Sequence, residues 1–126
     1  MAGTIVADTL THSTAGSIAT NYVVEGSAKH WVDYNQTVPS INASFNTSSV
    51  SDDSAGKYTP NLTSSMSSAN YGLSVTTRIE NSNQGYLTGP ESITASSYQG
   101  QVWRLAPTSA FTDSYFNSTA IHGDLA

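Results

Sequence analysis

The chain has 126 residues, no cysteine and a formal net charge of −5, and only 10% of its residues are Asp, Glu, Lys or Arg, against roughly 25% in an ordinary globular protein. Four basic residues cannot form the positive surface that displaces counterions from nucleic acid, so we expect no nucleic-acid partner. Without cysteine, neither a disulfide nor a thiolate metal site can form. Most of the polarity comes from 21 Ser, 16 Thr and 9 Asn, while 7 Tyr, 3 Phe and 2 Trp favour a folded, β-rich protein over disorder.

The N-terminus lacks the basic start and continuous apolar stretch of a secretory signal peptide. No run of 18 apolar residues, the length that indicates a membrane-spanning helix, occurs elsewhere. We therefore expect the protein to be made and folded in a cytosol and not to insert into a membrane.

The first third of the chain alternates between segments of strand character and turn residues. Residues 4–11 predict a first strand, and the polar stretch 12–17, with Gly16 as its turn, separates it from the rest. A second strand is expected over residues 20–25, which include Tyr22, Val23 and Val24, because β-branched and aromatic residues favour strands. Residues 1–19 are therefore expected to form an N-terminal arm, and residues 20–126 a β domain.

The segment 28–35 is expected to be a strand with two different faces. Side chains alternate across a strand, which places Val32 with Ala28, His30 and Tyr34 on one face and Trp31 with Lys29 and Asp33 on the other. In the next segment Ile41, Ala43 and Phe45 alternate with polar residues, the pattern of a half-buried strand. Pro39 limits pairing at its start, which suits an edge position.

Turn chemistry separates the remaining strand segments. Residues 51–56 form a dense turn signal, and we expect Gly56 to take a left-handed conformation there. Leu73, Val75, Thr77 and Ile79 alternate within a strand expected over residues 71–80, and residues 81–85 are a hairpin-like connection. Further short strands are expected at residues 86–88, 93–98, 99–105, 110–116 and 120–126. Strands at intervals of roughly 8–12 residues predict an all-β fold, an antiparallel β-sandwich or Greek-key barrel with an extended N-terminal arm.

Candidate catalytic and metal-binding residues do not form a recognisable pattern. The three histidines, His12, His30 and His122, lie far apart in sequence, and their spacing proposes no metal site. No G-x-S-x-G turn exposes a serine nucleophile. Asp52 and Asp53 are adjacent in a turn rather than facing one gap. We expect a protein that is not an enzyme and that holds no cofactor or metal.

Exposed aromatic side chains could form a platform on which a sugar stacks, although aromatic residues in a small β domain more often lie in the core or at an interface. The candidate glycan contacts are Tyr34, Tyr86 and Trp103. Trp31 could lie in the core, at a subunit interface or on such a platform. Because its face also carries Lys29 and Asp33, whose burial unpaired would be costly, we expect it at an interface.

The run from Gly26 to Asn35, G-S-A-K-H-W-V-D-Y-N, resembles the G-S-A-K-x-W-V-x-(F/Y)-N pattern of tail-fibre-like virion proteins of tailed phages, especially those of marine bacteria and cyanobacteria. The chain departs from the family where a glycine-bearing stretch usually follows, since Gln36-Thr37-Val38-Pro39 stands there. The resemblance continues through Ser44–Asp52, Gly56–Thr59, Asn61-Leu62, Met66 and Asn70-Tyr71, with Thr4–Leu10 similar to the leading strand and Ile121–Asp124 to the closing segment.

This resemblance implies a virion structural module, often trimeric and surface-displayed, with no catalytic residues. We expect a homotrimeric fibre, knob or spike that is made in the host cytoplasm and attached to capsid or tail proteins. Ile5, Val6, Leu10 and Trp31 are the expected subunit-interface or anchoring residues. The alternatives are a decoration protein that clamps major capsid subunits and a module that binds host surface polysaccharide.

Overall fold

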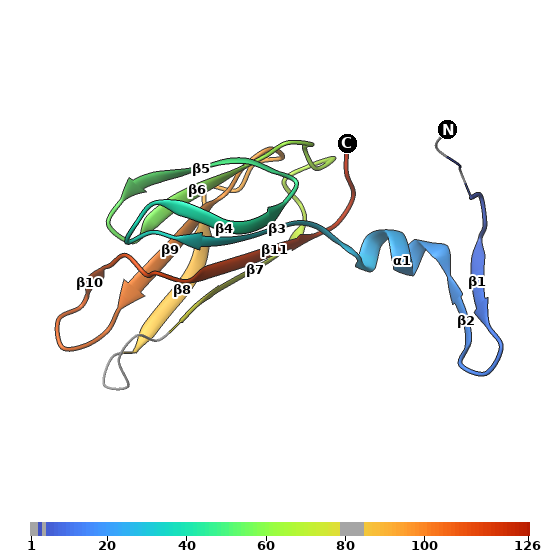
Figure 1. Cartoon of the computed structure of the whole chain (residues 1–126), viewed down its shortest axis with the longest axis horizontal. Coiled ribbons are helices and arrows are strands. Elements are labelled where there is room, and N and C mark those ends of the chain that lie inside the picture. Colours follow the sequence, from blue (N-terminus) through green and yellow to red (C-terminus); the bar gives the residue numbers. More distant parts are fainter. Residues whose placement is uncertain (1–2, 4, 79–84) are drawn as a thin grey trace.

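Two antiparallel sheets packed together form the body of the protein, and an N-terminal arm extends away from them (Figure 1). The computed structural model describes residues 3, 5–78 and 85–126, without the side chain of His12. The fold is mostly strand with one short helix, so the expected all-β class is confirmed. Thr4, Ile79 and Glu80, and most of the connection expected at 81–85, lie outside the described residues.

The arm consists of a small hairpin followed by the helix, so in the structure the name covers the described residues up to Gly26 rather than only those up to residue 19. Strand β1 (Thr9–His12) pairs with β2 (Gly16–Ala19), and α1 (Thr20–Gly26) follows directly. The first strand thus begins at Thr9 rather than at residue 4. Its pairing partner is β2 of the same chain. The hairpin belongs to neither sheet of the sandwich.

The first sheet of the sandwich has the order β4–β3–β11–β7. Its strands are β4 (Ser40–Phe45), β3 (Ala28–Asn35), β11 (Asn117–His122) and β7 (Gly72–Thr77). Strand β3 lies between β4 and β11, so the segment with the family-like motif is a central strand of this sheet. Edge strand β4 pairs with β3 through a register shift opposite Asp33 and Tyr34.

The second sheet has the order β10–β9–β6–β5, and a fifth strand, β8, also pairs with β9. Its strands are β5 (Thr47–Ser54), β6 (Lys57–Leu62), β8 (Tyr86–Glu91), β9 (Gln99–Arg104) and β10 (Ala110–Phe111). Only two residues of the strand expected over 110–116 pair. The strand expected at 93–98 is instead a turn in which the Thr94 hydroxyl accepts from the Ser97 amide at 3.0 Å.

The core lies between the sheets in two clusters, Val32–Tyr34–Tyr58–Val102 and Leu62–Met66–Tyr98–Ile121. The alternation expected in β3 is confirmed, because His30, Val32 and Tyr34 are buried and Trp31 points out of the core, 40% exposed. The turn residue Gly56 has the expected left-handed conformation, with φ of 67°.

The strand expected over residues 20–25 is wrong, because this segment forms α1. No strand of the described residues pairs with this segment, so its backbone groups bond locally as in a helix. The Lys29 ammonium donates to the carbonyls of Val24 and Ser27 at the end of the helix, where the last turn leaves carbonyl groups unpaired. Tertiary context therefore overrides the strand propensity of Tyr22, Val23 and Val24.

Gln36, whose structural role the sequence pattern does not indicate, is a buried polar clamp at one end of the sandwich. It is 1% exposed, and its backbone amide donates to the Ser114 carbonyl at 3.0 Å. Its Nε2 lies 3.1 Å from Asp52 Oδ1, 3.0 Å from the Ser54 carbonyl and 3.1 Å from the Lys57 carbonyl. The side chain therefore ties the turn after β3 to the β5–β6 hairpin.

We expect Gln36→Ala to lower the free energy of unfolding by about 2 kcal/mol, because it removes the hydrogen bonds that this buried amide donates to Asp52, Ser54 and Lys57. Urea denaturation of both proteins measures the difference. Gln99→Ala is the matched control, since the Gln99 amide bonds Asp53 at an exposed site, and it should cost less than about 1 kcal/mol. Equal losses in the two variants would contradict the clamp.

Candidate functional site

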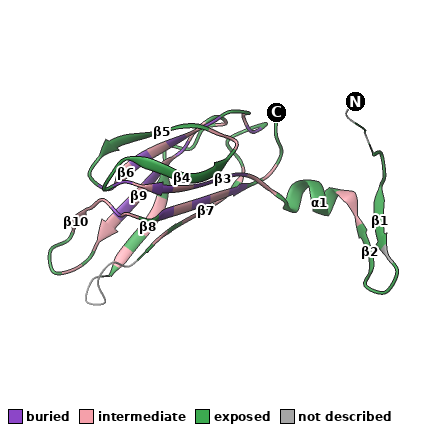
Figure 2. Cartoon of the chain, in the orientation of Figure 1, coloured by how far each residue is buried: buried purple, intermediate pink, exposed green. Residues whose placement is uncertain are grey.

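The N-terminal arm exposes more apolar side chains than its own structure can cover. None of the α1 residues is buried, and Figure 2 shows the hairpin and helix almost entirely in the colour of exposed residues. A seven-residue helix and an isolated two-stranded hairpin are each at best marginally stable in water without packing partners. The large exposed apolar side chains of the arm are Ile5, Val6, Leu10, Ile18, Tyr22, Val23 and Val24.

Five of these side chains border an apolar groove of about 440 Å³ between the extended segment 5–10 and α1. Thr20 holds the two walls together, because its hydroxyl donates to the Ala7 carbonyl at 2.7 Å and its amide to the Asp8 carbonyl at 2.9 Å. The groove is lined by Ile5, Val6, Ala7, Leu10, Thr20, Val23 and Val24. Three of the four expected interface or anchoring residues therefore lie together on it.

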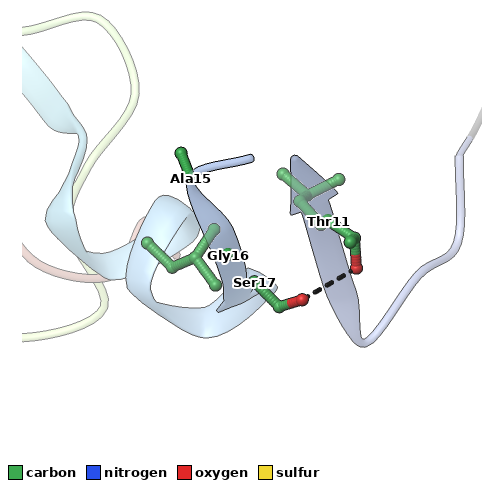
Figure 3. A pocket seen from close by; sticks show the side chains of 6 residues that line it. Thr11, Ala15, Gly16 and Ser17 are labelled. Atoms are coloured by element: carbon green, nitrogen blue, oxygen red, sulfur yellow. Dashed lines mark hydrogen bonds between the residues drawn. The ribbon is translucent and has the colours of Figure 1, made fainter. Parts of the chain in front are cut away.

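A second, smaller pocket of about 300 Å³ lies on the hairpin itself (Figure 3). The Thr11 and Ser17 hydroxyls are 3.0 Å apart across the two strands, and Leu10 and Ile18, which are partners in register, also line this pocket. Leu10 thus contributes to both hollows of the arm.

The arm joins the sandwich through a short, well-bonded connection. His122, at the end of β11, lies with Nδ1 3.0 Å from the Gly26 carbonyl. Lys29, the second residue of β3, donates to the Ser27 carbonyl at 3.0 Å. These contacts fix the point at which the arm leaves the body.

The fourth expected interface residue, Trp31, lies on the outer face of the first sheet. Its register partners are Phe45 on β4 and Ala120 on β11, and directly opposite residues point to the same face of a sheet. Phe45 is 54% exposed, so the two aromatic side chains form an exposed apolar patch. Beside it, Asn42 Nδ2 donates to Asp33 Oδ1 at 3.4 Å.

Asn46 holds this patch in place. It occupies the left-handed conformation, with φ of 56°. Its Nδ2 donates to the carbonyls of Lys29 and Ser64, both at 3.0 Å, and its Oδ1 accepts from the Ser64 amide at 2.7 Å. Phe45 therefore sits on a fixed backbone immediately before the chain turns into β5.

The half-buried pattern expected for Ile41, Ala43 and Phe45 is wrong, because all six residues of β4 are exposed. Strand β4 is at the edge of its sheet, and the chain continues from it into a strand of the other sheet. The alternation was a correct signal for a strand, but it cannot show whether another layer covers the apolar face.

The candidate glycan contacts do not form one platform. Tyr34 is 2% exposed in the core, so its ring is unavailable to a sugar. Tyr86 packs against that core cluster, while Trp103 contacts Phe111 edge to face with ring centroids 4.5 Å apart. Tyr86 pairs with Arg104 and Leu87 with Trp103, which places Tyr86 and Trp103 on opposite faces of the sheet.

Two titratable side chains make contacts within the sandwich. His30 is fully buried, its Nε2 lies 3.0 Å from the Thr47 hydroxyl, and desolvation lowers its pKa to about 4. Asp53 Oδ2 accepts from Thr59 at 2.6 Å. Within residues 3, 5–78 and 85–126, no group of three or more His, Asp or Glu side chains is placed to hold a metal ion. In the same residues, no helix has the length and hydropathy to cross a membrane.

No protein-family model, curated protein or solved structure matches this chain. The resemblance to tail-fibre-like virion proteins therefore rests on the motif of residues 26–35 and the segments that follow it, and it stays a prediction.

Proposed function

We propose that this chain is a non-enzymatic structural module of a tailed-phage virion, which assembles as a homotrimeric fibre, knob or spike. The arm provides its attachment to neighbouring subunits and to the particle. The sandwich is the displayed body. The motif of residues 26–35 supports the virion assignment.

The observation that carries the proposal is the arm, with its exposed apolar side chains and its groove of about 440 Å³. Burial of a Val, Leu or Ile side chain contributes about 1.5–3 kcal/mol, so covering several of them supplies the free energy that an assembly contact needs. The described part of the arm carries only two formally charged residues, Asp8 and Glu25, and few like charges would therefore meet around a symmetry axis.

A decoration protein that clamps capsid subunits would use the same protruding arm, so it is the second candidate. The fibre and the decoration protein differ in where the protein lies on the particle. Electron microscopy of whole particles, with an antibody against the sandwich, should label a tail appendage for the first and the capsid shell for the second.

We expect replacement of Val23 and Val24 by Asn to weaken self-association at least tenfold, because it removes apolar area from one wall of the groove. Light scattering over a concentration series should give at least about three times 13.3 kDa for the unaltered chain and a smaller mass for the variant. Leu87→Asn, at a comparably exposed apolar residue on β8, is the control and should keep the full mass. A monomeric unaltered chain at micromolar concentration would contradict the trimer.

A further inference from the structure

Strand β4 presents a free edge, because it pairs with β3 on one side and no strand of the described residues pairs with the other. Its sequence is Ser-Ile-Asn-Ala-Ser-Phe, with neither a charged residue nor a proline, and every residue is exposed. An unpaired edge of this kind offers a row of backbone donors and acceptors to another strand.

The other outer strands each carry a feature that discourages such pairing. Strand β5 bears Asp52 and Asp53, β8 ends in Pro90 and Glu91, and β10 has only two residues. Strand β7 lies against β8, where the Thr88 hydroxyl donates to the Val75 carbonyl at 3.0 Å. Charges, proline, short length and bulges are the usual protections of sheet edges, and β4 itself has only the register shift near Asn42.

The absence of charge on β4 favours a second copy of the same strand as its partner. When a strand pairs with its own copy across a two-fold axis, residues near the axis meet their own counterparts, and like charges placed opposite one another are destabilising. The chain as a whole carries a net charge of −5, yet the uninterrupted stretch from Gln36 to Asn46 has no charged residue.

The aromatic patch lies beside this edge. Phe45 belongs to β4 and Trp31 is its partner on β3. The register between them is regular from Ala43 to Phe45, because the shift lies beyond Asp33. The straight half of the strand, near Ala43 and Ser44, is therefore the part that can accept a further strand.

We propose that β4 pairs antiparallel with β4 of a second copy, which joins two four-stranded sheets into one continuous sheet. The Trp31–Phe45 patches of the two copies then lie on the same face, on either side of the two-fold axis. This contact is separate from the arm, so an assembly held by its arms can be linked to another through the sandwiches.

The absence of native cysteine permits a direct test in the full chain. Single cysteines at Asn42, Ala43 and Ser44 should give, on mild oxidation, a disulfide-linked dimer of about twice 13.3 kDa, with the highest yield at the residue nearest the axis. Ser51→Cys, exposed on the protected edge strand β5, is the matched control and should stay uncrosslinked. Equal yields at β4 and at Ser51 would overturn the proposal.

Charge complementation identifies the partner as a second copy. Ala43→Lys alone and Ala43→Glu alone should each weaken the β4 contact at least tenfold, and an equal mixture of the two should restore it. The readout is the cross-linking yield of a cysteine at Ser44 in both chains, with Ser51→Lys as the control for added charge. Failure of the mixture to restore the yield would overturn self-pairing. Adding Val23→Asn and Val24→Asn, which weaken the arm contact, should leave this cross-linking yield unchanged. The experiment therefore tests the β4 contact separately from the arm contact of the proposed function.

Discussion

Replacing Gly56 with alanine is expected to lower the free energy of unfolding by about 4 kcal/mol, as two costs combine. The residue has φ of 67°, and an alanine Cβ there would lie 2.6 Å from the Thr112 amide nitrogen and would also collide with the Val102 carbonyl. The left-handed conformation costs an L-residue roughly 1–2 kcal/mol, and overpacking typically adds about 1–3 kcal/mol.

The backbone around Gly56 cannot shift to relieve this clash. Its amide donates to Asp113 Oδ1 at 2.7 Å, and its carbonyl accepts from the Val102 amide at 2.8 Å. Chemical denaturation measures the loss, with Gly89→Ala as the control because a Cβ at Gly89 would meet nothing within 4 Å. The control should lose less than about 1 kcal/mol. Similar losses of unfolding free energy in Gly56→Ala and Gly89→Ala would contradict the prediction, because they would show that the backbone moves away from the new Cβ at residue 56.

Acidification is expected to destabilise the protein through His30. Desolvation lowers the pKa of this buried imidazole to about 4 from its ordinary value of 6.5. Nδ1 has no hydrogen-bond partner among the described residues, and the ring meets Tyr98 edge to face with centroids 5.6 Å apart. The fold therefore holds His30 neutral, whereas the unfolded chain takes up the proton near pH 6.5.

Because the unfolded state binds the proton more tightly, the stability from this group is complete above pH 6.5 and falls as the pH drops toward 4. The loss is about 2 kcal/mol at pH 5 and reaches about 3 kcal/mol below pH 4. Urea denaturation at pH 7, 5.5 and 4.5 measures it. His30→Phe, which keeps an aromatic ring against Tyr98, should flatten the dependence over this range.

His122→Asn is the control for the histidine prediction. His122 is exposed at the end of β11, so this variant controls for the replacement of a histidine outside the core. An unaltered slope in His30→Phe would show that other groups cause the acid sensitivity.

The arm and the outer sheet face illustrate what sequence can predict of an exposed apolar surface. The sequence pointed to Ile5, Val6, Leu10 and Trp31 as candidate interface residues, and the structure places all four at the surface. It did not point to Phe45, whose alternation with polar neighbours indicated burial. Only the register with β3 brings Phe45 beside Trp31, and register depends on strands that are distant in sequence.

The sequence by itself determined the all-β class, the face of β3 that is buried and the left-handed turn at Gly56. These features follow from local rules, namely the two-residue period of a strand and the steric freedom of glycine. The tertiary structure alone decided that residues 20–26 are helical, that β4 is uncovered on both faces, and that Gln36 closes one end of the sandwich. In each case the outcome depends on which backbone and side-chain groups have a partner in space, and a residue's own sequence neighbours do not specify that partner.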